Sequence, residues 1–316
     1  MDPIVRSSPV PKDFCNPNTD CDPAEVVANI LNKYHPRLIA FGEIHMPCGS
    51  NKLPGARSTM EIFAESIMPE LAKHHINDLV IEFIVSDQFI ETELNYFYSP
   101  NGSLDEQNTP YLFALSNICI FQGIRELLTK SKALGIRVHG GGPTYAEINN
   151  PEIQHEVMRY ELGLSSLTPK LDRLITKKLE EKIRQVMALP GKNVASYGGA
   201  LHNDIDPGQN PQVTFGWKFQ RNLGSRYVEV DLALRNNLTS ALKDSSHPDL
   251  QLFKRHSEPF RNTCWQRASF LAHFVISLKD VIDPAQLLAE VPKTIFITPG
   301  PVRTTLIRNR PDQWPQ

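Results

Sequence analysis

Short runs of apolar residues recur along the chain, each closed by a glycine, a proline or a polar residue. Leu38-Ile39-Ala40-Phe41 ends at Gly42, and Leu79-Val80-Ile81 continues past Glu82 into Phe83-Ile84. Runs of this length between turn-forming residues are typical of buried strands. The predicted strands cover residues 37–42, 79–84, 135–139, 193–197, 227–231 and 294–297.

Between these runs the apolar residues recur every three or four positions, which is the spacing of an amphipathic helix. Asp22 followed by Pro23 is a helix start, with Asp22 as the N-cap. Ser58 and Glu61 have the spacing of a capping box, which also begins a helix. Helices are predicted from residue 22, over 58–75, 87–98, 111–134, 147–188 with a break near 163–169, and 264–278.

Strands that alternate with helices predict an α/β fold, with a mostly parallel sheet and helices on both of its faces. The long helical stretch at about 144–190 is expected to form an insert over the carboxyl ends of the strands. Residues 1–21 are expected to form an irregular N-terminal arm, 22–307 a single α/β domain, and 308–316 a polar, proline-rich tail.

Composition excludes several classes of protein. Of the 316 residues, 41% are hydrophobic and 22% are charged, and the net charge of -2 provides no basic field to attract nucleic acid or an anionic membrane. No run of apolar residues is long enough to span a bilayer. Five scattered cysteines without a C-x-x-C pair favour free thiols in a reducing cytoplasm.

Reactive side chains come soon after two of the predicted strands. Glu43 and His45 come directly after the first strand, and His202 follows the strand at 193–197. The spacing Gly-x-x-His occurs at both places, from Gly42 to His45 and from Gly199 to His202. In open α/β sheets, ligands bind outside the carboxyl ends of the strands, so both histidines are expected at that edge.

Glu82 interrupts an apolar run, and a buried carboxylate is costly unless it is paired, hydrogen-bonded or bound to a metal. His45 and His202 are its candidate partners. We therefore expect Glu43, His45, Glu82 and His202 to meet in one cleft and to be catalytic. For either histidine taken alone, a structural role is the alternative.

Four further residues are expected to bind substrate: Arg57, His139, Tyr197 and Asn203. Arg57 could hold an anionic group from the loop or helix start that follows His45. His139 precedes Gly140–Gly142, which lack the register of a dinucleotide-binding motif and are expected to form a tight turn beside a ligand. Tyr197 and Asn203 flank the second Gly-x-x-His motif.

The segments Gly42-Glu43-Ile44-His45 and Tyr197-Gly198-Gly199-Ala200-Leu201-His202-Asn203, together with Glu82, resemble a known superfamily. It joins the erythromycin esterase-like proteins, the ChaN-like haem-binding proteins, and the TraB and Tiki metalloprotease-like proteins. The likeness covers about residues 36–231 and implies an α/β sheet with its site at the carboxyl edge. Tiki-like members use such histidines and glutamates in metal-dependent hydrolysis, whereas esterase-like members activate water without a metal.

The leading hypothesis is a hydrolase that activates water with a Glu/His group. It would use either no cofactor or a divalent metal held by His45, Glu82 and His202. One alternative is a haem-binding protein with Tyr197 or His202 as the axial ligand. Another is cleavage of a glycosidic or ADP-ribosyl bond on a partner protein. The expected partner is a small-molecule or modified-protein substrate, with no nucleic acid and no membrane.

Overall fold

The computed structural model describes residues 22–43, 58–115, 123–161, 168–205, 211–234, 263–266 and 274–278. All of them belong to one compact unit, Met1–Ile282. The second unit, Asp283–Gln316, lies outside the described residues, as do the predicted N-terminal arm, the predicted tail and the predicted strand at 294–297.

A single sheet forms the centre of the fold, and its strands stand in the order β3-β2-β4-β1-β5-β7-β6. Neighbouring strands run parallel except for β6, which is antiparallel to β7. The prediction of an α/β fold with a mostly parallel sheet is therefore confirmed. The strands are β1 (Leu38–Glu43), β2 (Asp78–Val85), β3 (Arg137–Gly142), β4 (Val194–Gly199), β5 (Tyr227–Leu234), β6 (Thr263–Gln266) and β7 (Phe274–Leu278).

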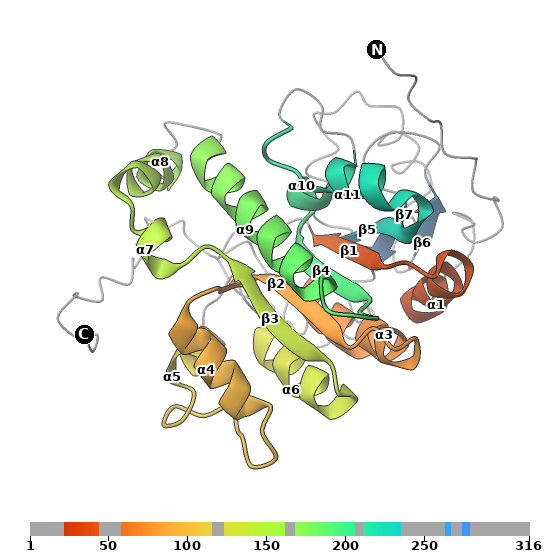
Figure 1. The fold of residues 1–316 in the computed structure, drawn as a ribbon, viewed down its shortest axis with the longest axis horizontal. Helices are drawn as coiled ribbons and strands as arrows, with labels where there is room; N and C mark the ends of the chain where they lie inside the picture. Colours follow the sequence, from red (N-terminus) through yellow and green to blue (C-terminus); the bar gives the residue numbers. More distant parts are fainter. Residues whose placement is uncertain are drawn as a thin grey trace, which may run out of the picture. The chain divides into compact units, whose positions relative to one another are not determined.

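Helices cover both faces of this sheet (Figure 1). On one face, Phe63 and the helices around it pack against Phe41 in a large core cluster. On the other face, Leu179 and Phe219 pack against Ala40 and Val80. The helices are α1 (Pro23–Tyr34), α2 (Thr59–Ile62), α3 (Met68–Lys73), α4 (Gln88–Phe97), α5 (Pro110–Leu115), α6 (Ile124–Leu134), α7 (Tyr145–Ile148), α8 (Pro151–Glu161), α9 (Pro169–Met187), α10 (Ala200–Asn203) and α11 (Gly216–Leu223). None of the helices in the described part of the chain has the length and apolarity needed to cross a membrane.

The two helix starts predicted at Asp22 and at Ser58 are present in the structure. The Asp22 side chain accepts a hydrogen bond from the N–H of Ala24, and Ser58 and Glu61 form the expected capping box. Between α2 and α3 the helix widens into a π-helical turn, Phe63–Ile67. Pro69 follows this turn and has no N–H to donate, which accounts for the irregular hydrogen bonding there.

The prediction of a helix over 264–278 is wrong, because the structure has β6 and β7 in this stretch. β7 pairs with β5 and extends the sheet, and β6 pairs with β7. The stretch contains Val275 and Ile276, whose branched side chains favour strands. The spacing of apolar residues alone did not show that β5 has a further strand, β7, as its neighbour in the sheet.

The predicted helix over 111–134 is also not continuous. α5 ends at Leu115, and α6 begins only after Gly123, whose φ of 101° is outside the range of a right-handed helix. The intervening residues 116–122 lie outside the described part of the chain. Gly123 therefore separates two helices where the apolar pattern predicted one.

Gly140–Gly142 form the last half of β3 rather than the expected tight turn. The register between β2 and β3 shifts between Ile81 and Val85, so that β2 bulges where it passes these glycines. A Cβ atom on Gly142 would overlap the carbonyl oxygen of Glu82. The glycines therefore give the bulge of β2 room, and this bulge contains Glu82.

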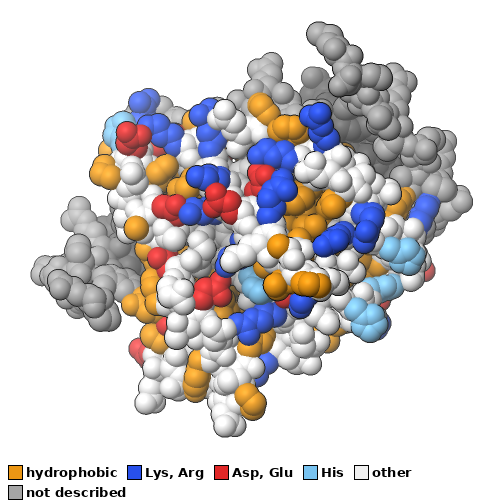
Figure 2. Space-filling view, in the orientation of Figure 1, with side chains coloured by type: hydrophobic (Ala, Val, Ile, Leu, Met, Phe, Trp, Pro, Cys, Tyr) orange, Lys and Arg blue, Asp and Glu red, His pale blue; other side chains and the backbone are white. Residues whose placement is uncertain are grey.

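The stretch expected to form a helical insert contains α7, α8 and α9. α9 crosses one face of the sheet between β3 and β4 (Figure 1), and its residues Leu179 and Ile183 belong to the core there. On the surface of this face, basic and acidic side chains alternate (Figure 2). Lys182 of α9 pairs with Glu91 at 2.7 Å, which ties α9 to α4.

Candidate functional site

Three of the four predicted catalytic residues lie at the carboxyl edge of three adjacent strands. Glu43 is the last residue of β1, Glu82 lies near the end of β2, and His202 stands in α10 directly after β4. The strand order places β4 between β2 and β1. The fourth residue, His45, and the predicted anion-binding Arg57 both lie outside the described residues.

Glu82 is buried and contacts the backbone of the second Gly-x-x-His motif. Its Oε2 atom accepts a hydrogen bond from the N–H of Gly199 at 2.6 Å. Gly198 makes this approach possible, because a Cβ atom on it would lie only 2.9 Å from the Cβ of Glu82 and would overlap Oε2. The glycines of this motif therefore let a carboxylate from β2 reach β4.

The Oε1 atom of Glu82 faces His202, whose Nε2 atom lies 3.6 Å away. Both side chains are almost fully buried, with exposed fractions of 7% and 6%. His202 is thus one of the two histidines predicted as partners of Glu82. At this distance the pair forms an ion pair if His202 is protonated, but no direct hydrogen bond of ordinary length.

The other ring nitrogen of His202 is held by α9 and by the segment after α10. Nδ1 lies 2.8 Å from the hydroxyl oxygen of Thr176 and 3.3 Å from the carbonyl oxygen of Val213. A carbonyl oxygen can only accept, so a proton on Nδ1 has an acceptor there. The ring of His202 is thus held from its Nδ1 side, while Nε2 faces Glu82.

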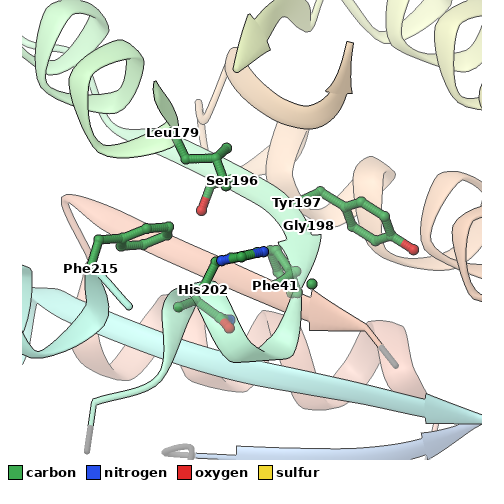
Figure 3. Close-up of a pocket in the computed structure, with 9 residues that line it drawn as sticks. Phe41, Leu179, Ser196, Tyr197, Gly198, His202 and Phe215 are labelled. Atoms are coloured by element: carbon green, nitrogen blue, oxygen red, sulfur yellow. The ribbon is translucent and has the colours of Figure 1, made fainter. Parts of the chain in front are cut away.

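The carboxylate of Glu43 accepts a hydrogen bond from the hydroxyl of Tyr197. Burial, followed by the charges of Glu43 and Glu82, raises the pKa of Tyr197 well above its ordinary value, so its hydroxyl stays protonated. The ring of Tyr197 packs against that of Phe63, with 4.5 Å between the ring centroids, and it points away from His202 (Figure 3). Tyr197 is buried and supports Glu43, and it also lines the small pocket beside His202, so its contact with substrate stays a prediction.

Asn203, which was also expected to bind substrate, is buried and lines the pocket beside His202, so this role stays a prediction. With its amide oriented to satisfy both neighbours, it donates to the carbonyl oxygen of Ala200 at 2.6 Å and accepts from the N–H of Gly42 at 3.1 Å. Tyr227 donates to the carbonyl oxygen of Asn203 at 2.7 Å. These bonds fix α10, and with it His202, against β1 and β5.

His139 does not join this group. Its Nε2 atom lies 2.9 Å from Asp78, the first residue of β2, and Asp78 also pairs with Lys192 at 2.7 Å. Burial would raise the pKa of Asp78, but the hydrogen bonds from His139 and Lys192 outweigh it and lower that pKa. The pair lies toward the amino ends of β2 and β3, away from Glu82, which differs from the predicted substrate contact.

Two polar residues of α9 reach the site and were missed by the sequence analysis. Thr176 contacts His202 directly, and Asp172 stands one turn earlier on the same face of the helix. Burial raises the pKa of Asp172, while the charge of His202 lowers it and that of Glu82 raises it. The four-residue spacing was the available signal, but nothing in the sequence showed that α9 begins beside β4.

A small pocket lies next to His202 (Figure 3). Its volume open to water-sized molecules is about 10 Å³, close to the least that one water needs. Its lining includes the backbone of Gly198 and Gly199, the rings of Phe41 and Phe215, and His202 itself. The described residues therefore leave room for about one water molecule beside the histidine.

A divalent metal fits part of this arrangement. Ligand atoms at about 2.1 Å from one tetrahedral ion lie roughly 3.4 Å apart, close to the 3.6 Å between Nε2 of His202 and Oε1 of Glu82. The contacts of Nδ1 with acceptors also match the usual support of a metal-binding histidine. Within the described ranges, however, no three His, Cys, Asp or Glu side chains form a metal-binding group. The predicted third ligand, His45, lies outside them.

A haem fits the described residues poorly. The pocket beside His202 has the size of one water, far smaller than a porphyrin. The hydroxyl of Tyr197, one of the two expected axial ligands, is buried and already donates to Glu43. The Nε2 atom of His202, the other expected axial ligand, faces the carboxylate of Glu82.

No family model and no curated protein matches this chain. Solved structures with a similar fold include the type III effector HopBA1, at 14% identity and a TM-score of 0.45, covering 84% of this chain and 98% of that one. The MARTX toxin effector domain RRSP from Vibrio vulnificus CMCP6 matches at 12% identity and a TM-score of 0.43, over 72% of this chain and 38% of that one. ChaN of Campylobacter jejuni, which was solved with cofacial haem, matches at 13% identity and a TM-score of 0.42, over 79% and 90%.

Proposed function

We propose that this chain is a hydrolase in which His202 deprotonates a water molecule. The observation behind the proposal is the opposition of two proton acceptors, Nε2 of His202 and Oε1 of Glu82, at 3.6 Å. A water about 2.8 Å from each atom would donate one proton to each of them. The histidine then takes the proton as general base, which contributes about 10²–10⁴-fold to a rate.

Glu82 has two roles in this scheme. It orients the water before proton transfer and stabilises the imidazolium of His202 afterwards. The hydrogen bond from the N–H of Gly199 at 2.6 Å holds its carboxylate in place. Asp172 adds a second carboxylate near His202 and so favours the same charged intermediate.

The bond that is cleaved is an ester, a peptide, a glycosidic bond or an ADP-ribosyl linkage, on a small molecule or on a modified protein. All four need an activated water and differ in the group that leaves. A divalent metal bound by His202, Glu82 and His45 would supply the activated water instead, with Glu82 and His202 as ligands. His45 and Arg57 keep their predicted roles, as a third active-site group and as an anion-binding group.

The test compares two histidines of this chain that both face a carboxylate. His202→Gln removes the proposed base, whereas His139→Gln removes the partner of Asp78 away from the site. Both variants and the wild-type protein are assayed against a panel of esters, peptides, glycosides and ADP-ribosylated proteins. Circular dichroism and thermal unfolding check that each variant is folded.

We expect His202→Gln to lower kcat by about a hundredfold or more and His139→Gln to leave it nearly unchanged. Equal loss in both folded variants would contradict a specific role for His202. Hydrolysis that persists in His202→Gln would contradict the proposal directly. Repeating the wild-type assay after chelation separates the metal-free scheme from the metal-dependent one.

A further inference from the structure

The hydroxyl of Thr176 stands at the junction of three groups that come from distant parts of the chain. Its oxygen lies 2.8 Å from the carbonyl oxygen of Asp172, 2.8 Å from that of Val213 and 2.8 Å from Nδ1 of His202. Thr176 is only 1% exposed, so no bulk water competes for these bonds.

Counting protons restricts how these bonds are arranged. A threonine hydroxyl has one proton and two lone pairs, and both carbonyl oxygens can only accept. Two of its three neighbours can only accept, which favours donation to Asp172 or to Val213 and leaves the hydroxyl oxygen to accept from Nδ1 of His202. Donation from Thr176 to Nδ1 would instead leave two carbonyl oxygens at 2.8 Å without the proton of this hydroxyl.

We propose that Thr176 is a positioning residue that selects the tautomer of His202 with the proton on Nδ1. This inference rests on the proposed function, because only that tautomer leaves Nε2 able to accept a proton from water. Glu82 acts in the opposite direction, since its carboxylate stabilises a proton on Nε2. Without the hydroxyl, Nδ1 keeps only the carbonyl oxygen of Val213, at 3.3 Å, and the proton moves to Nε2.

The tautomer can be measured directly by NMR on protein labelled with ¹⁵N-histidine, about two pH units above the ordinary histidine pKa of about 6.5. Protonated and unprotonated ring nitrogens differ strongly in chemical shift. The signals of His202 are assigned by their loss in His202→Gln. The variants are Thr176→Val, which removes the hydroxyl and keeps the shape, and Thr176→Ser, which keeps the hydroxyl. Thr176→Ala is the second hydroxyl-free variant and replaces Thr176→Val if that protein does not fold.

We expect wild-type and Thr176→Ser protein to have the proton on Nδ1, and the hydroxyl-free variant to shift the equilibrium toward Nε2 by about tenfold, the effect of one hydrogen bond. On a substrate found in the panel, kcat should fall with the fraction of His202 that keeps Nε2 unprotonated, by at most this factor, with little change in KM. A wild-type proton on Nε2, or an unchanged tautomer in the hydroxyl-free variant, overturns the inference. If the tautomer responds as expected but no substrate of the panel is hydrolysed, the positioning role stands and the proposed hydrolase activity fails.

Discussion

Nε2 of His202 lies 3.6 Å from Oε1 of Glu82, although the two residues are far apart in sequence. β2 and β4 are adjacent in the sheet, and the bulge of β2 directs Glu82 toward the start of α10. Gly198 leaves the space that the carboxylate occupies. The contact is thus a product of strand order, a bulge and a missing side chain together.

Glu82→Gln should abolish hydrolysis while leaving the fold intact. The glutamine oxygen can still accept from the N–H of Gly199, and its NH₂ group can donate to Nε2 of His202. That donation occupies the lone pair that would accept the proton from water. We expect kcat to fall about a hundredfold or more, and the free energy of unfolding to change by less than about 1 kcal/mol, because a buried charge is removed.

The combination of unfolding and kinetic measurements decides this prediction. Urea unfolding gives the stability, and steady-state assays give kcat and KM on the substrate identified by the panel. A folded Glu82→Gln protein with wild-type kcat would show that this carboxylate has no part in the reaction.

Gly198→Ala should disturb the site by steric overlap with Glu82. The added Cβ would lie 2.9 Å from the Cβ of Glu82 and closer still to its carboxylate. We expect a loss of roughly 1–3 kcal/mol of stability, the range for overpacking a dense interior, together with lower activity. Combining it with Glu82→Ala removes the overlap with the carboxylate and leaves only the contact between the two Cβ atoms. The double variant should therefore lose less stability than the sum of the two single losses. If the stability lost by the double variant equals the sum of the two single losses, the strain does not come from the contact between residues 198 and 82.

The ion pairs of Asp78, which lies at the amino end of β2, should make the stability of the protein depend on pH. The hydrogen bonds from His139 and Lys192 lower its pKa in the folded state despite burial. The stability from this pair is therefore fully present above the ordinary aspartate pKa and is lost as pH falls through the lowered value. Asp78→Asn should cost about 1–3 kcal/mol at neutral pH, and the difference from wild type should shrink below about pH 4. Urea unfolding across this range measures it, and a difference that stays constant with pH would contradict the pairing.

The strands were the most predictable part of the fold, because a buried parallel strand needs an uninterrupted apolar run. β1 matches such a run, whereas Glu82 interrupts the run of β2, and Glu229 and Asp231 interrupt that of β5. β4 was also predicted, and the capping box at Ser58 correctly marked the start of α2. β6 and β7 escaped this method because their apolar residues also fit a helical spacing. Gly140–Gly142 were misassigned because glycine in a strand is needed only when another backbone passes close, which the sequence does not show.

The site was predictable to the extent that it follows from strand ends. Glu82 and His202 were paired correctly because a buried carboxylate requires a partner. The contact between the rings of Tyr197 and Phe63 could not be predicted, because only the packing of helices on the sheet shows which side chain a strand residue meets. Asp172 and Thr176 could not be found, because a crossover helix brings them to β4 from outside the strand ends.

Metal dependence gives a further prediction that separates the two schemes for water activation. If His202 acts as a base on free water, extensive chelation should leave kcat unchanged. If His202, Glu82 and His45 bind a divalent ion, chelation should abolish turnover, and adding back the metal should restore it. Elemental analysis of protein purified without chelator gives the stoichiometry. Full activity in chelated protein with no bound metal rules out the metal-dependent scheme.

His45 remains the sharpest untested prediction from the sequence, since it lies outside the described residues. It follows Glu43 by two positions, and Glu43 ends β1 at the same edge as Glu82 and His202. On either scheme it acts through a neutral imidazole nitrogen, so His45→Ala should lower kcat by about a hundredfold or more. The protein should remain folded, because a residue at the edge of the sheet fills little of the core, and a surface substitution changes stability by about 0.5 kcal/mol or less. His139→Gln, at the opposite end of the strands, is the matched control. Unfolding of His45→Ala, or turnover equal to that of the wild type, would show that the first Gly-x-x-His motif has a structural role, and the proposed site would then consist of Glu82 and His202 with their support from α9.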